Sequence, residues 1–325
     1  MQNTLLKSNN LSMNTFQSVQ IESFVNKLTS KGKCFTYEFS APASFNLELL
    51  FNNLQNKQFI KELDAFVCTD SPLGKLKHSA ILASLKLQTT FKIPSITTIS
   101  MRDKNTLALQ SDIVGMNSLD LRLILALTGD PLRLGNQPQA KGVFEGNSLL
   151  LLKIINALNH KKDINGEALK GDSKLIYPFC VLNSYANKKE NLYRKMQEKI
   201  QNGAQAIFTQ PIYDINIAQE LLEWCERINI QNQTKCVLVF GFFPIFSYKT
   251  ALFLHHKLPG VFVPKSWLEE MKQANEKNTE AQIGLEKSRV LFSNLYKIHQ
   301  KFHFMSANKP DLIEGIICQK NDKIY

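Results

Sequence analysis

The sequence has no run of about 18 apolar residues, which excludes a membrane-spanning helix by length. Only 14 glycines and 11 prolines occur in 325 residues, so the chain is neither collagen-like nor of low complexity. The N-terminal residues lack the apolar segment of a secretory signal. We expect residues 1–20 to be a poorly ordered tail.

None of the six cysteines stands in a CxxC pair, and the chain is too long for a disulfide-framed mini-domain. Several lie in apolar, strand-like runs, where a free cysteine behaves as a small hydrophobic residue. The six are Cys34, Cys68, Cys180, Cys225, Cys236 and Cys318. We therefore expect reduced thiols, a cytoplasmic protein and no metal site.

The net charge of +11 is compatible with nucleic acid, a membrane surface or an anionic small molecule as partner. The lysines are scattered, and no zinc-finger, helix-turn-helix or aromatic–basic motif is present. We expect no nucleic-acid partner and no membrane partner. The motifs GxGxxG, GxxxxGK[ST] and HExxH are also missing, so a flavin or nicotinamide would have to bind by another geometry.

Short apolar runs alternate with helical patterns along the chain, and the runs are rich in β-branched or aromatic residues. They lack strict apolar–polar alternation, which is typical of parallel strands buried on both faces. The expected strands are Cys34–Ser40, Ala65–Thr69, Ser95–Ser100, Leu121–Leu127, Tyr177–Leu182, Ala206–Thr209, Lys235–Phe240 and Phe302–Phe304. Eight strand–helix pairs predict an α/β fold, a single (β/α)8 TIM barrel. The eighth run is weak, so a doubly wound sheet stays open.

Helical spacing fills the intervals between the expected strands. The clearest patterns are Leu107–Met116, Ser148–Leu158, Leu192–Gln201 and Ile217–Ile228. The interval Leu258–Ile298 is too long for one connection, and its polar part Lys272–Thr279 predicts an exposed helical insertion before the last strand. The predicted organisation is an N-terminal extension over residues 1–30 and a catalytic barrel over residues 31–325.

A barrel of this kind carries its active site at the carboxyl ends of the strands, so polar residues there are informative. Glu38 lies among aromatic residues in the first strand. Burial raises the pKa of a carboxyl group and makes it a candidate general acid near neutral pH. A solvent-facing residue at the edge of the strand is the alternative.

Two further acidic residues follow expected strands. Asp130 stands in the turn Thr128-Gly129-Asp130, where glycine permits close approach of a ligand to the backbone. Asp103 follows the third strand. Each aspartate either faces the mouth of the barrel or caps the helix that comes next.

Several segments resemble methylenetetrahydrofolate reductases. Residues 100–105 (SMRDKN) and 109–112 (LQSD) resemble the family's TCRDRN and LQSDLLG. Residues 124–131 (ILALTGDP) resemble its NILALTGDP, and residues 202–214 (NGAQAIFTQPIYD) resemble its xAGAxxxxTQPxFD. With Thr36–Phe39 in the family's first strand, ordered similarity runs from about Thr36 to Tyr248.

The resemblance implies a barrel enzyme that reduces 5,10-methylenetetrahydrofolate to 5-methyltetrahydrofolate and thereby supplies methyl groups for methionine synthesis. It implies FAD as cofactor, with FMN or no flavin as open alternatives. NADH or NADPH would reduce the flavin, and the folate would then take the hydride. The implied partners are a folate and a nicotinamide dinucleotide, with a homo-oligomer or a methyltransferase partner left open.

The resemblance also assigns roles to individual residues. Glu38 is similar to the family's general acid, which helps to open the methylene bridge to an iminium ion, and Asp130 to the aspartate whose charge favours that cation. Gln210 resembles a substrate-binding glutamine, and Tyr248 an aromatic residue that stacks on folate or nicotinamide. The implied cofactor contacts are Thr69, Asp103, Thr128, Gly129, Asn183 and Lys199.

The chain departs from the family in four places, one of which is Ala41–Ser44 after the first strand, where the family has Pro-Pro. Thr98 stands where many members have histidine, and Leu182–Asn187 is nearer the VVNPxA form of a divergent branch that can be fused to methyltransferases. His303–Asn308 differs from the family's usual last strand and loop. A flavin-free folate-binding barrel, or a non-catalytic one acting with a methyltransferase or electron-transfer partner, stays open as an alternative.

Overall fold

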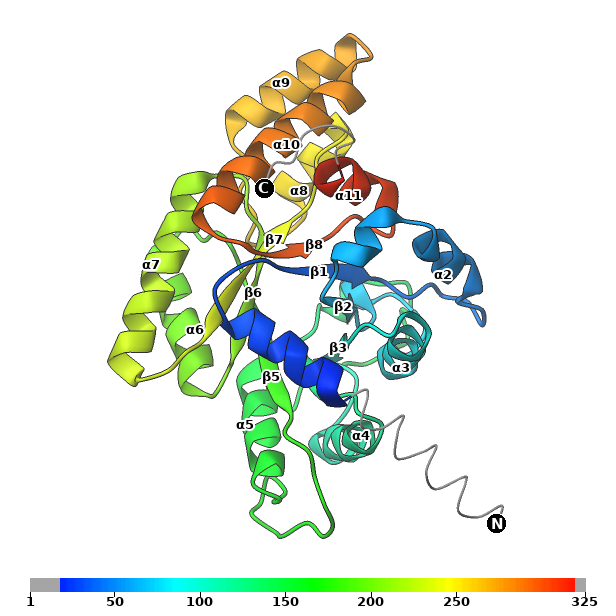
Figure 1. Cartoon of the computed structure of the whole chain (residues 1–325), viewed down its shortest axis with the longest axis vertical. Coiled ribbons are helices and arrows are strands. Elements are labelled where there is room, and N and C mark those ends of the chain that lie inside the picture. The colour runs from blue at the N-terminus through cyan, green and yellow to red at the C-terminus, as the bar shows by residue number, and fades with distance from the viewer. Residues whose placement is uncertain (1–17, 319–325) are drawn as a thin grey trace. The chain divides into compact units, whose positions relative to one another are not determined.

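The computed structural model describes residues 18–318. Eight strands form a closed barrel in chain order (Figure 1). They are β1 (Cys34–Phe39), β2 (Ala65–Cys68), β3 (Ser95–Ser100), β4 (Leu123–Leu127), β5 (Tyr177–Leu182), β6 (Ala206–Pro211), β7 (Val237–Phe242) and β8 (Lys301–Phe304). Parallel pairing of β1 with β8 leaves no open edge. The predicted (β/α)8 TIM barrel is confirmed, and the doubly wound sheet is wrong.

Helices occupy the intervals between the strands. Residues 18–29 are helical and precede β1. The later helices are α2 (Glu48–Gln55), α3 (Ala80–Phe91), α4 (Thr106–Ser118), α5 (Ser148–Asn159), α6 (Lys189–Gln201), α7 (Ile215–Asn232), α8 (Tyr248–His256), α9 (Lys265–Glu276), α10 (Glu280–Ile298) and α11 (Pro310–Ile317). Short 3-10 turns are η1 (Gln58–Glu62), η2 (Pro72–Gly74) and η3 (Leu132–Leu134).

The chain divides into two compact units. The first comprises residues 18–31, 39–47 and 64–179 of the described chain. Its N-terminal helix buries Phe24 edge-on to Phe179, with ring centroids 6.5 Å apart, while Glu22 pairs with the buried Arg122 at 3.0 Å. The expectation of a poorly ordered tail is therefore wrong for residues 18–20, which belong to this helix, and residues 1–17 lie outside the described residues.

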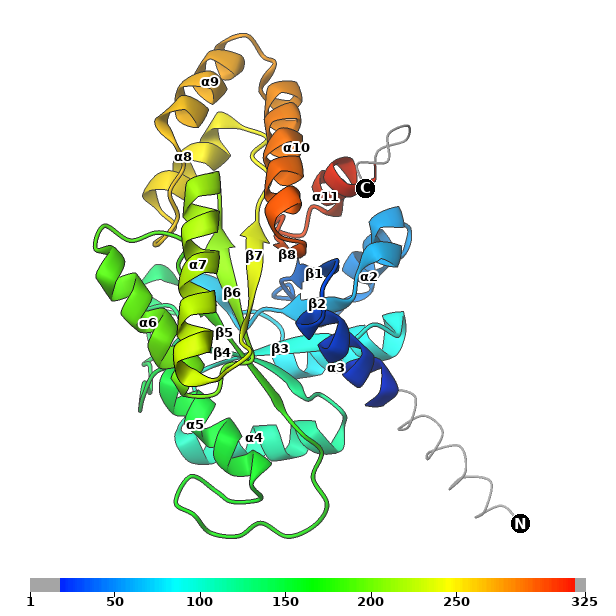
Figure 2. The same cartoon turned by 60° about the vertical axis from the view of Figure 1, so that its left-hand side comes forward.

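The second unit comprises residues 32–38, 48–63 and 180–318 of the described chain. Its core is aromatic: Phe35 of β1 meets Phe292 of α10 and Phe304 of β8, with ring centroids 6.3 and 5.2 Å apart. Side chains alternate between the two faces of a strand. Because Phe35 points toward the helix, Thr36 and Glu38 lie on the opposite, inner face of β1. In the same unit α6 and α7 lie side by side (Figure 2).

Three helices separate β7 from β8. Helices α9 and α10 run side by side and are joined by a short turn at residues 277–279 (Figure 1). The segment Lys272–Thr279 forms the end of α9 and this turn, and it is exposed apart from Ala274. The predicted helical insertion is confirmed. Its inner side is packed, since Trp267, Met271 and Phe292 are buried.

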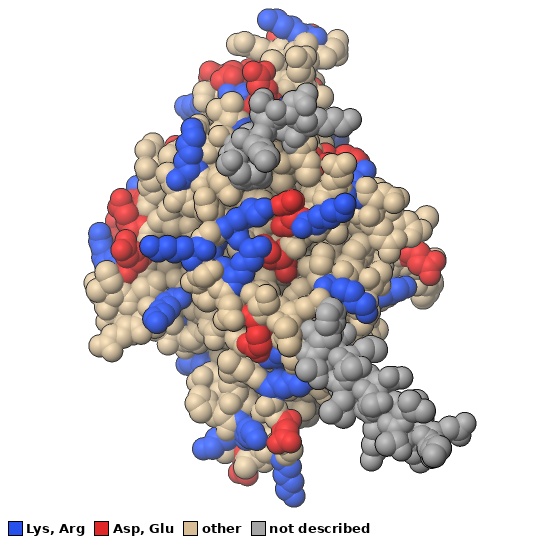
Figure 3. Space-filling view, in the orientation of Figure 1, with Lys and Arg blue, Asp and Glu red and all other residues tan. Residues whose placement is uncertain are grey.

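Basic and acidic side chains lie among one another on the face drawn in Figure 3. Several lysines are paired with carboxylates, such as Lys27 with Asp64 and Lys33 with Glu62. Ion pairs therefore neutralise some of the lysines individually, while the excess of basic residues remains. Among residues 18–318, no helix is long and apolar enough to cross a membrane.

Candidate functional site

Glu38 stands at the carboxyl end of β1, on the inner face of the strand. Two residues earlier, Thr36 Oγ1 lies 3.0 Å from Nδ1 of the buried His303 on β8. Burial lowers the pKa of His303 to about 3, so this imidazole is neutral. Burial likewise raises the pKa of Glu38 from 4.5 to about 7. Glu38 therefore retains a proton close to neutral pH, as the general acid predicted from the sequence must.

The raised pKa of Glu38 makes folding stability depend on pH. The folded state binds this proton more tightly than the unfolded state, so the stabilisation is complete below pH 4.5 and is lost as the pH rises through about 7. Glu38→Gln removes the buried charge. We compare the free energy of unfolding of Glu38→Gln with that of the wild type. The difference in favour of the variant should grow by about 2 kcal/mol between pH 5 and pH 8. Urea unfolding at both pH values measures this, and a pH-independent difference would contradict it.

Gln210 stands near the carboxyl end of β6. Phe208, two residues earlier, packs edge-on against His303 with ring centroids 5.5 Å apart, and the pairing register of β6 with β7 shifts between Phe208 and Pro211. In the same stretch, Gly241 N donates to Thr209 Oγ1 at 2.9 Å, and a Cβ on Gly241 would collide with the Thr209 carbonyl oxygen. Glu38 and Gln210 thus each stand near the carboxyl end of their strand.

Asn183 and the following residue tie the end of β5 to neighbouring loops. Ser184 Oγ donates to the Pro211 carbonyl at 2.8 Å and to the Gly260 carbonyl at 3.1 Å. Gly260 has φ +80°, and a Cβ there would overlap the Asn183 side chain. Asn183 is consequently held against a backbone that only glycine suits. Sequence reasoning missed Ser184 and Gly260, since no local pattern marks them.

Tyr248 lies at the start of α8, and Lys199 lies near the end of α6. Tyr248 is the first residue of α8 and half-exposed, and its backbone N–H donates to Glu280 Oε2 at 2.8 Å. Lys199 lies in the last turn of α6, where its charge opposes the burial that raises the pKa of Cys180 to about 11. Asp214, which follows β6, caps α7 by accepting from Asn216 N at 2.8 Å.

In the first compact unit, Arg102 organises the polar groups that follow β3. It is 1 % exposed, and its Nε and Nη2 donate to the two carboxylate oxygens of Asp103 at 2.8 and 2.6 Å. Its Nη1 donates to the Ser71 carbonyl at 3.1 Å. This two-bond geometry holds Asp103 firmly. The helix-cap alternative for Asp103 is wrong, because Asn105 caps α4 by accepting from Ala108 N.

Asp130 is exposed, and it contacts two other loops, one through its carboxylate and one through its backbone carbonyl. Its Oδ2 accepts from Leu73 N at 2.7 Å, and its backbone carbonyl lies 3.4 Å from Arg102 Nη1. Asp130 does not cap a helix, so the capping alternative is wrong here too. Thr128 Oγ1 accepts from Ser148 N at 3.1 Å, which fixes the other end of this turn to α5.

Gly129 sits at the centre of that turn with φ +97°, and a Cβ would lie 2.6 Å from Arg102 Cβ. Gly129→Ala combines backbone strain with this clash. Gly166 is a matched control, because its φ is +95° but nothing lies within 4 Å of its Cβ position. We expect Gly129→Ala to lower the free energy of unfolding by about 1–3 kcal/mol more than Gly166→Ala does. Equal losses in urea unfolding would show that the contact with Arg102 is not restrictive.

The end of β2 supplies two polar groups. Asp70 Oδ2 accepts from Ser100 Oγ at 2.8 Å and from Ser100 N at 3.2 Å. Burial nevertheless raises the pKa of the Asp70 carboxyl, against the effect of these bonds. The neighbouring Thr69 hydroxyl is buried without a hydrogen-bond partner, as are those of Thr97 and Thr98 on β3. Buried hydroxyls without a partner in the protein call for an explanation, such as a bound ligand. Of these three threonines, only Thr69 is predicted from the sequence to be a cofactor contact.

Among residues 18–318, no group of three or more His, Cys, Asp or Glu side chains could hold a metal ion. The polar groups described above include carboxyls, amides and hydroxyls. They suit hydrogen bonding and proton transfer to an organic ligand.

Many chains of known structure match this fold, among them the two that follow. An uncharacterized protein from Clostridium thermocellum that binds two copies of 5-methyl-5,6,7,8-tetrahydrofolic acid superposes with a TM-score of 0.62 at 15% identity, covering 91% of this chain and 96% of its own. EDTA monooxygenase from Chelativorans sp. BNC1 gives a TM-score of 0.52 at 11% identity, covering 87% and 91%. At these identities the similarity establishes the fold alone.

No curated protein matches the sequence significantly. A family model described as methylenetetrahydrofolate reductase matches residues 23–321. This range contains every predicted site residue, and of the described chain it leaves out only residues 18–22 of the first compact unit. The chain belongs to the methylenetetrahydrofolate reductase family.

Proposed function

We propose that this protein reduces 5,10-methylenetetrahydrofolate to 5-methyltetrahydrofolate with a bound flavin, which NADH or NADPH reduces. The observation that carries the proposal is Glu38, a carboxyl on the inner face of β1 whose pKa burial raises to about 7. Family membership and the folate-binding neighbour support a folate as the substrate. The product would supply methyl groups for methionine synthesis.

Glu38 would act as the general acid in opening the five-membered ring of the substrate. Breaking the bond between the methylene carbon and N10 leaves an electron pair on N10, which requires a proton. Glu38, protonated near neutral pH, supplies it. The other product of this step is an iminium cation at N5, and hydride addition to its methylene carbon gives the N5-methyl group. Gln210, two residues after the Phe208 that contacts His303, would hydrogen-bond the folate.

Asp130 would stabilise the iminium cation through its charge. Its carboxylate is fixed by Leu73 N at 2.7 Å but remains exposed on its other side. A fixed anion facing a cation that forms only during the reaction lowers the barrier. Tyr248 would stack on the folate or the nicotinamide with its half-exposed ring.

The residues at the ends of β2, β3 and β4 fit a flavin. The buried, unpaired hydroxyls of Thr69 and Thr98 need partners, and Gly129 offers backbone without a side chain. When bound, FAD supplies two-electron chemistry that accepts a hydride from a nicotinamide and delivers it to the folate. Thr128, Asp103 and Asn183 would bind it through hydrogen bonds, and Lys199 through its charge on the phosphates.

We expect this function in the cytoplasm. The six cysteines are free thiols, which is the state that a reducing compartment maintains. The barrel could also act as a homo-oligomer or beside a methyltransferase.

Product analysis tests the proposed function. Purified protein would be incubated anaerobically with methylenetetrahydrofolate, each nicotinamide donor, and FAD, FMN or no added flavin, and the folates identified by mass spectrometry. We expect 5-methyltetrahydrofolate, with FAD giving the highest rate. Folate that binds but is recovered unchanged in every mixture would favour the non-catalytic folate-binding barrel instead.

A further inference from the structure

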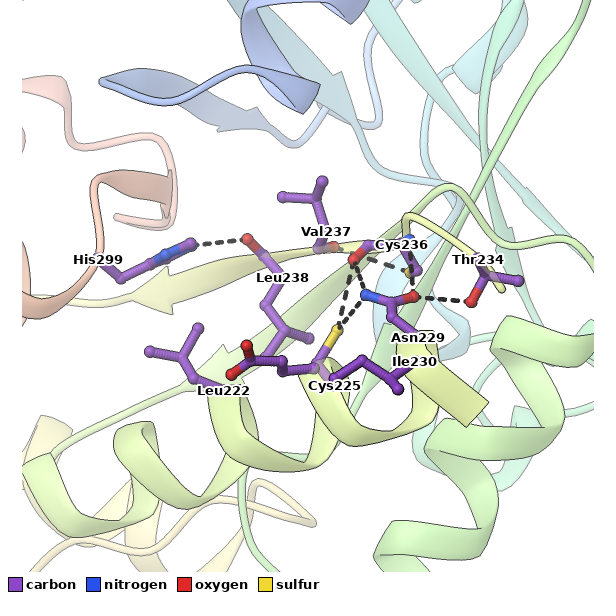
Figure 4. A pocket seen from close by; sticks show the side chains of 10 residues that line it. Leu222, Cys225, Asn229, Ile230, Thr234, Cys236, Val237, Leu238 and His299 are labelled. Carbon is purple, nitrogen blue, oxygen red and sulfur yellow. Dashed lines mark hydrogen bonds between the residues drawn. The ribbon is translucent and has the colours of Figure 1, made fainter. Parts of the chain in front are cut away.

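A cavity of about 410 Å³ lies between the second half of α7 and the start of β7, and two thiols line it (Figure 4). Cys225 comes from α7, and Cys236 directly precedes β7. Glu226, Asn229, Thr234 and His299 provide the polar lining. In this unit the cavity lies at the amino end of β7, whereas Glu38 and Gln210 stand at the carboxyl ends of β1 and β6. The proposed folate chemistry uses none of these groups.

One amide side chain holds the two cysteines in register. Asn229 Nδ2 donates to the Cys236 carbonyl at 2.8 Å, and Asn229 Oδ1 accepts from Cys236 N at 2.9 Å. The Cys225 sulfur lies 3.4 Å from that same carbonyl oxygen and 3.7 Å from Asn229 Nδ2. The Cys236 sulfur itself lies 4.0 Å from the Val237 carbonyl oxygen. Cys225 and Cys236 are therefore neighbours in space although they belong to different elements.

The surroundings make the two thiols unequal. Hydrogen bonds from the Cys236 thiol and from Asn229 lower the pKa of Cys225, against the effect of burial. The same contact raises the pKa of Cys236 well above its ordinary value. Burial also raises the pKa of Cys318, although Cys318 is more exposed than the other five cysteines. Since the thiolate is the nucleophile, Cys225 is favoured for reaction.

We propose that Cys225 and Cys236 form an oxidisable pair in which Cys225 attacks a hydroperoxide and Cys236 then closes a disulfide. In the first step the Cys225 sulfur takes one peroxide oxygen, the O–O bond breaks, and the departing oxygen leaves as water or an alcohol after gaining a proton. Sulfur is oxidised to a sulfenic acid by two electrons, and the peroxide is reduced. In the second step the Cys236 sulfur displaces hydroxide, which takes the Cys236 proton and leaves as water.

The cavity provides the access that this chemistry requires. Each cysteine is only 5–6 % exposed as a residue, so bulk thiol reagents are hindered, but about 410 Å³ admits a small hydroperoxide. The disulfide would tie α7 to the start of β7 across a sequence separation of 11 residues.

Hydrogen peroxide and peptide mapping under non-reducing conditions test the proposal on the full-length protein. We expect a Cys225–Cys236 cross-linked peptide that dithiothreitol cleaves, forming about tenfold faster than any oxidation of Cys318. Cys225→Ser should abolish the cross-link, while the control Cys318→Ser should leave its rate unchanged. The wild-type map decides the matter even if a variant folds poorly.

Two results would overturn the proposal. One is oxidation of Cys318 ahead of Cys225, which would mean that exposure rather than the cavity governs reactivity. The other is the absence of the cross-link in wild-type protein at a peroxide dose that oxidises its methionines. Neither result bears on the folate reaction, so the two proposals stand or fall separately.

Discussion

Glu38→Gln should slow folate reduction by about 10²–10⁴-fold while leaving reduction of the flavin by the nicotinamide intact. The substitution keeps the size of the side chain but removes the proton that N10 requires, and general acids contribute about 10²–10⁴-fold to rate. Anaerobic stopped-flow absorbance would measure the two half-reactions separately. Equal loss in both would mean that Glu38 maintains the structure or binds the cofactor rather than donating a proton.

The pH dependence of the same half-reaction provides an independent readout. With a Glu38 pKa of about 7, the protonated acid is lost above neutrality, so the wild-type rate of folate reduction should fall about tenfold per pH unit there. Below pH 7 the rate should be level. The residual rate of Glu38→Gln should lack this dependence. Glu62→Gln is the control, because Glu62 pairs with Lys33 and does not lie on the inner face of β1. It should behave as wild type.

Asp130→Asn should slow folate reduction by about 10²-fold and affect flavin reduction much less. The amide oxygen of asparagine can still accept from Leu73 N, so the turn keeps its anchor while the charge that favours the iminium cation is lost. Stopped-flow measurement of both half-reactions, with thermal unfolding as a check on folding, separates these effects.

Asp112→Asn is the matched control for Asp130→Asn, because Asp112 pairs with Lys104 on the outside of α4. It should leave both half-reactions unchanged. An Asp130→Asn enzyme with the wild-type rate toward methylenetetrahydrofolate would remove Asp130 from the mechanism.

The strands could be predicted because their sequences are short apolar runs that only a doubly covered parallel sheet accommodates. β3 and β5 match the prediction at both ends. The predicted Lys235–Phe240 ends two residues too early, since β7 reaches Phe242 and includes Gly241. Glycine normally argues against a strand interior, but here it allows the backbone of β6 to come close. The predicted Leu121–Leu127 starts two residues before β4, which begins at Leu123.

The position of Glu38 was predictable, because an acidic residue in an aromatic strand implies burial and hence a raised pKa. The pairing of Arg102 with Asp103 was not, since sequence cannot tell which of four consecutive polar residues turns inward. Nor could it be predicted that Asn105 would be the helix cap. The contacts of Ser184 with Pro211 and Gly260 join segments 27 and 76 residues apart, which only the folded chain brings together.

The most direct test of the account is the absorbance spectrum of the protein with added FAD, recorded anaerobically before and after NADH and then methylenetetrahydrofolate. The account predicts a bound flavin band that bleaches with the nicotinamide and returns when the folate is added. A folded protein that binds no flavin, or a reduced flavin that the folate does not reoxidise, would contradict it.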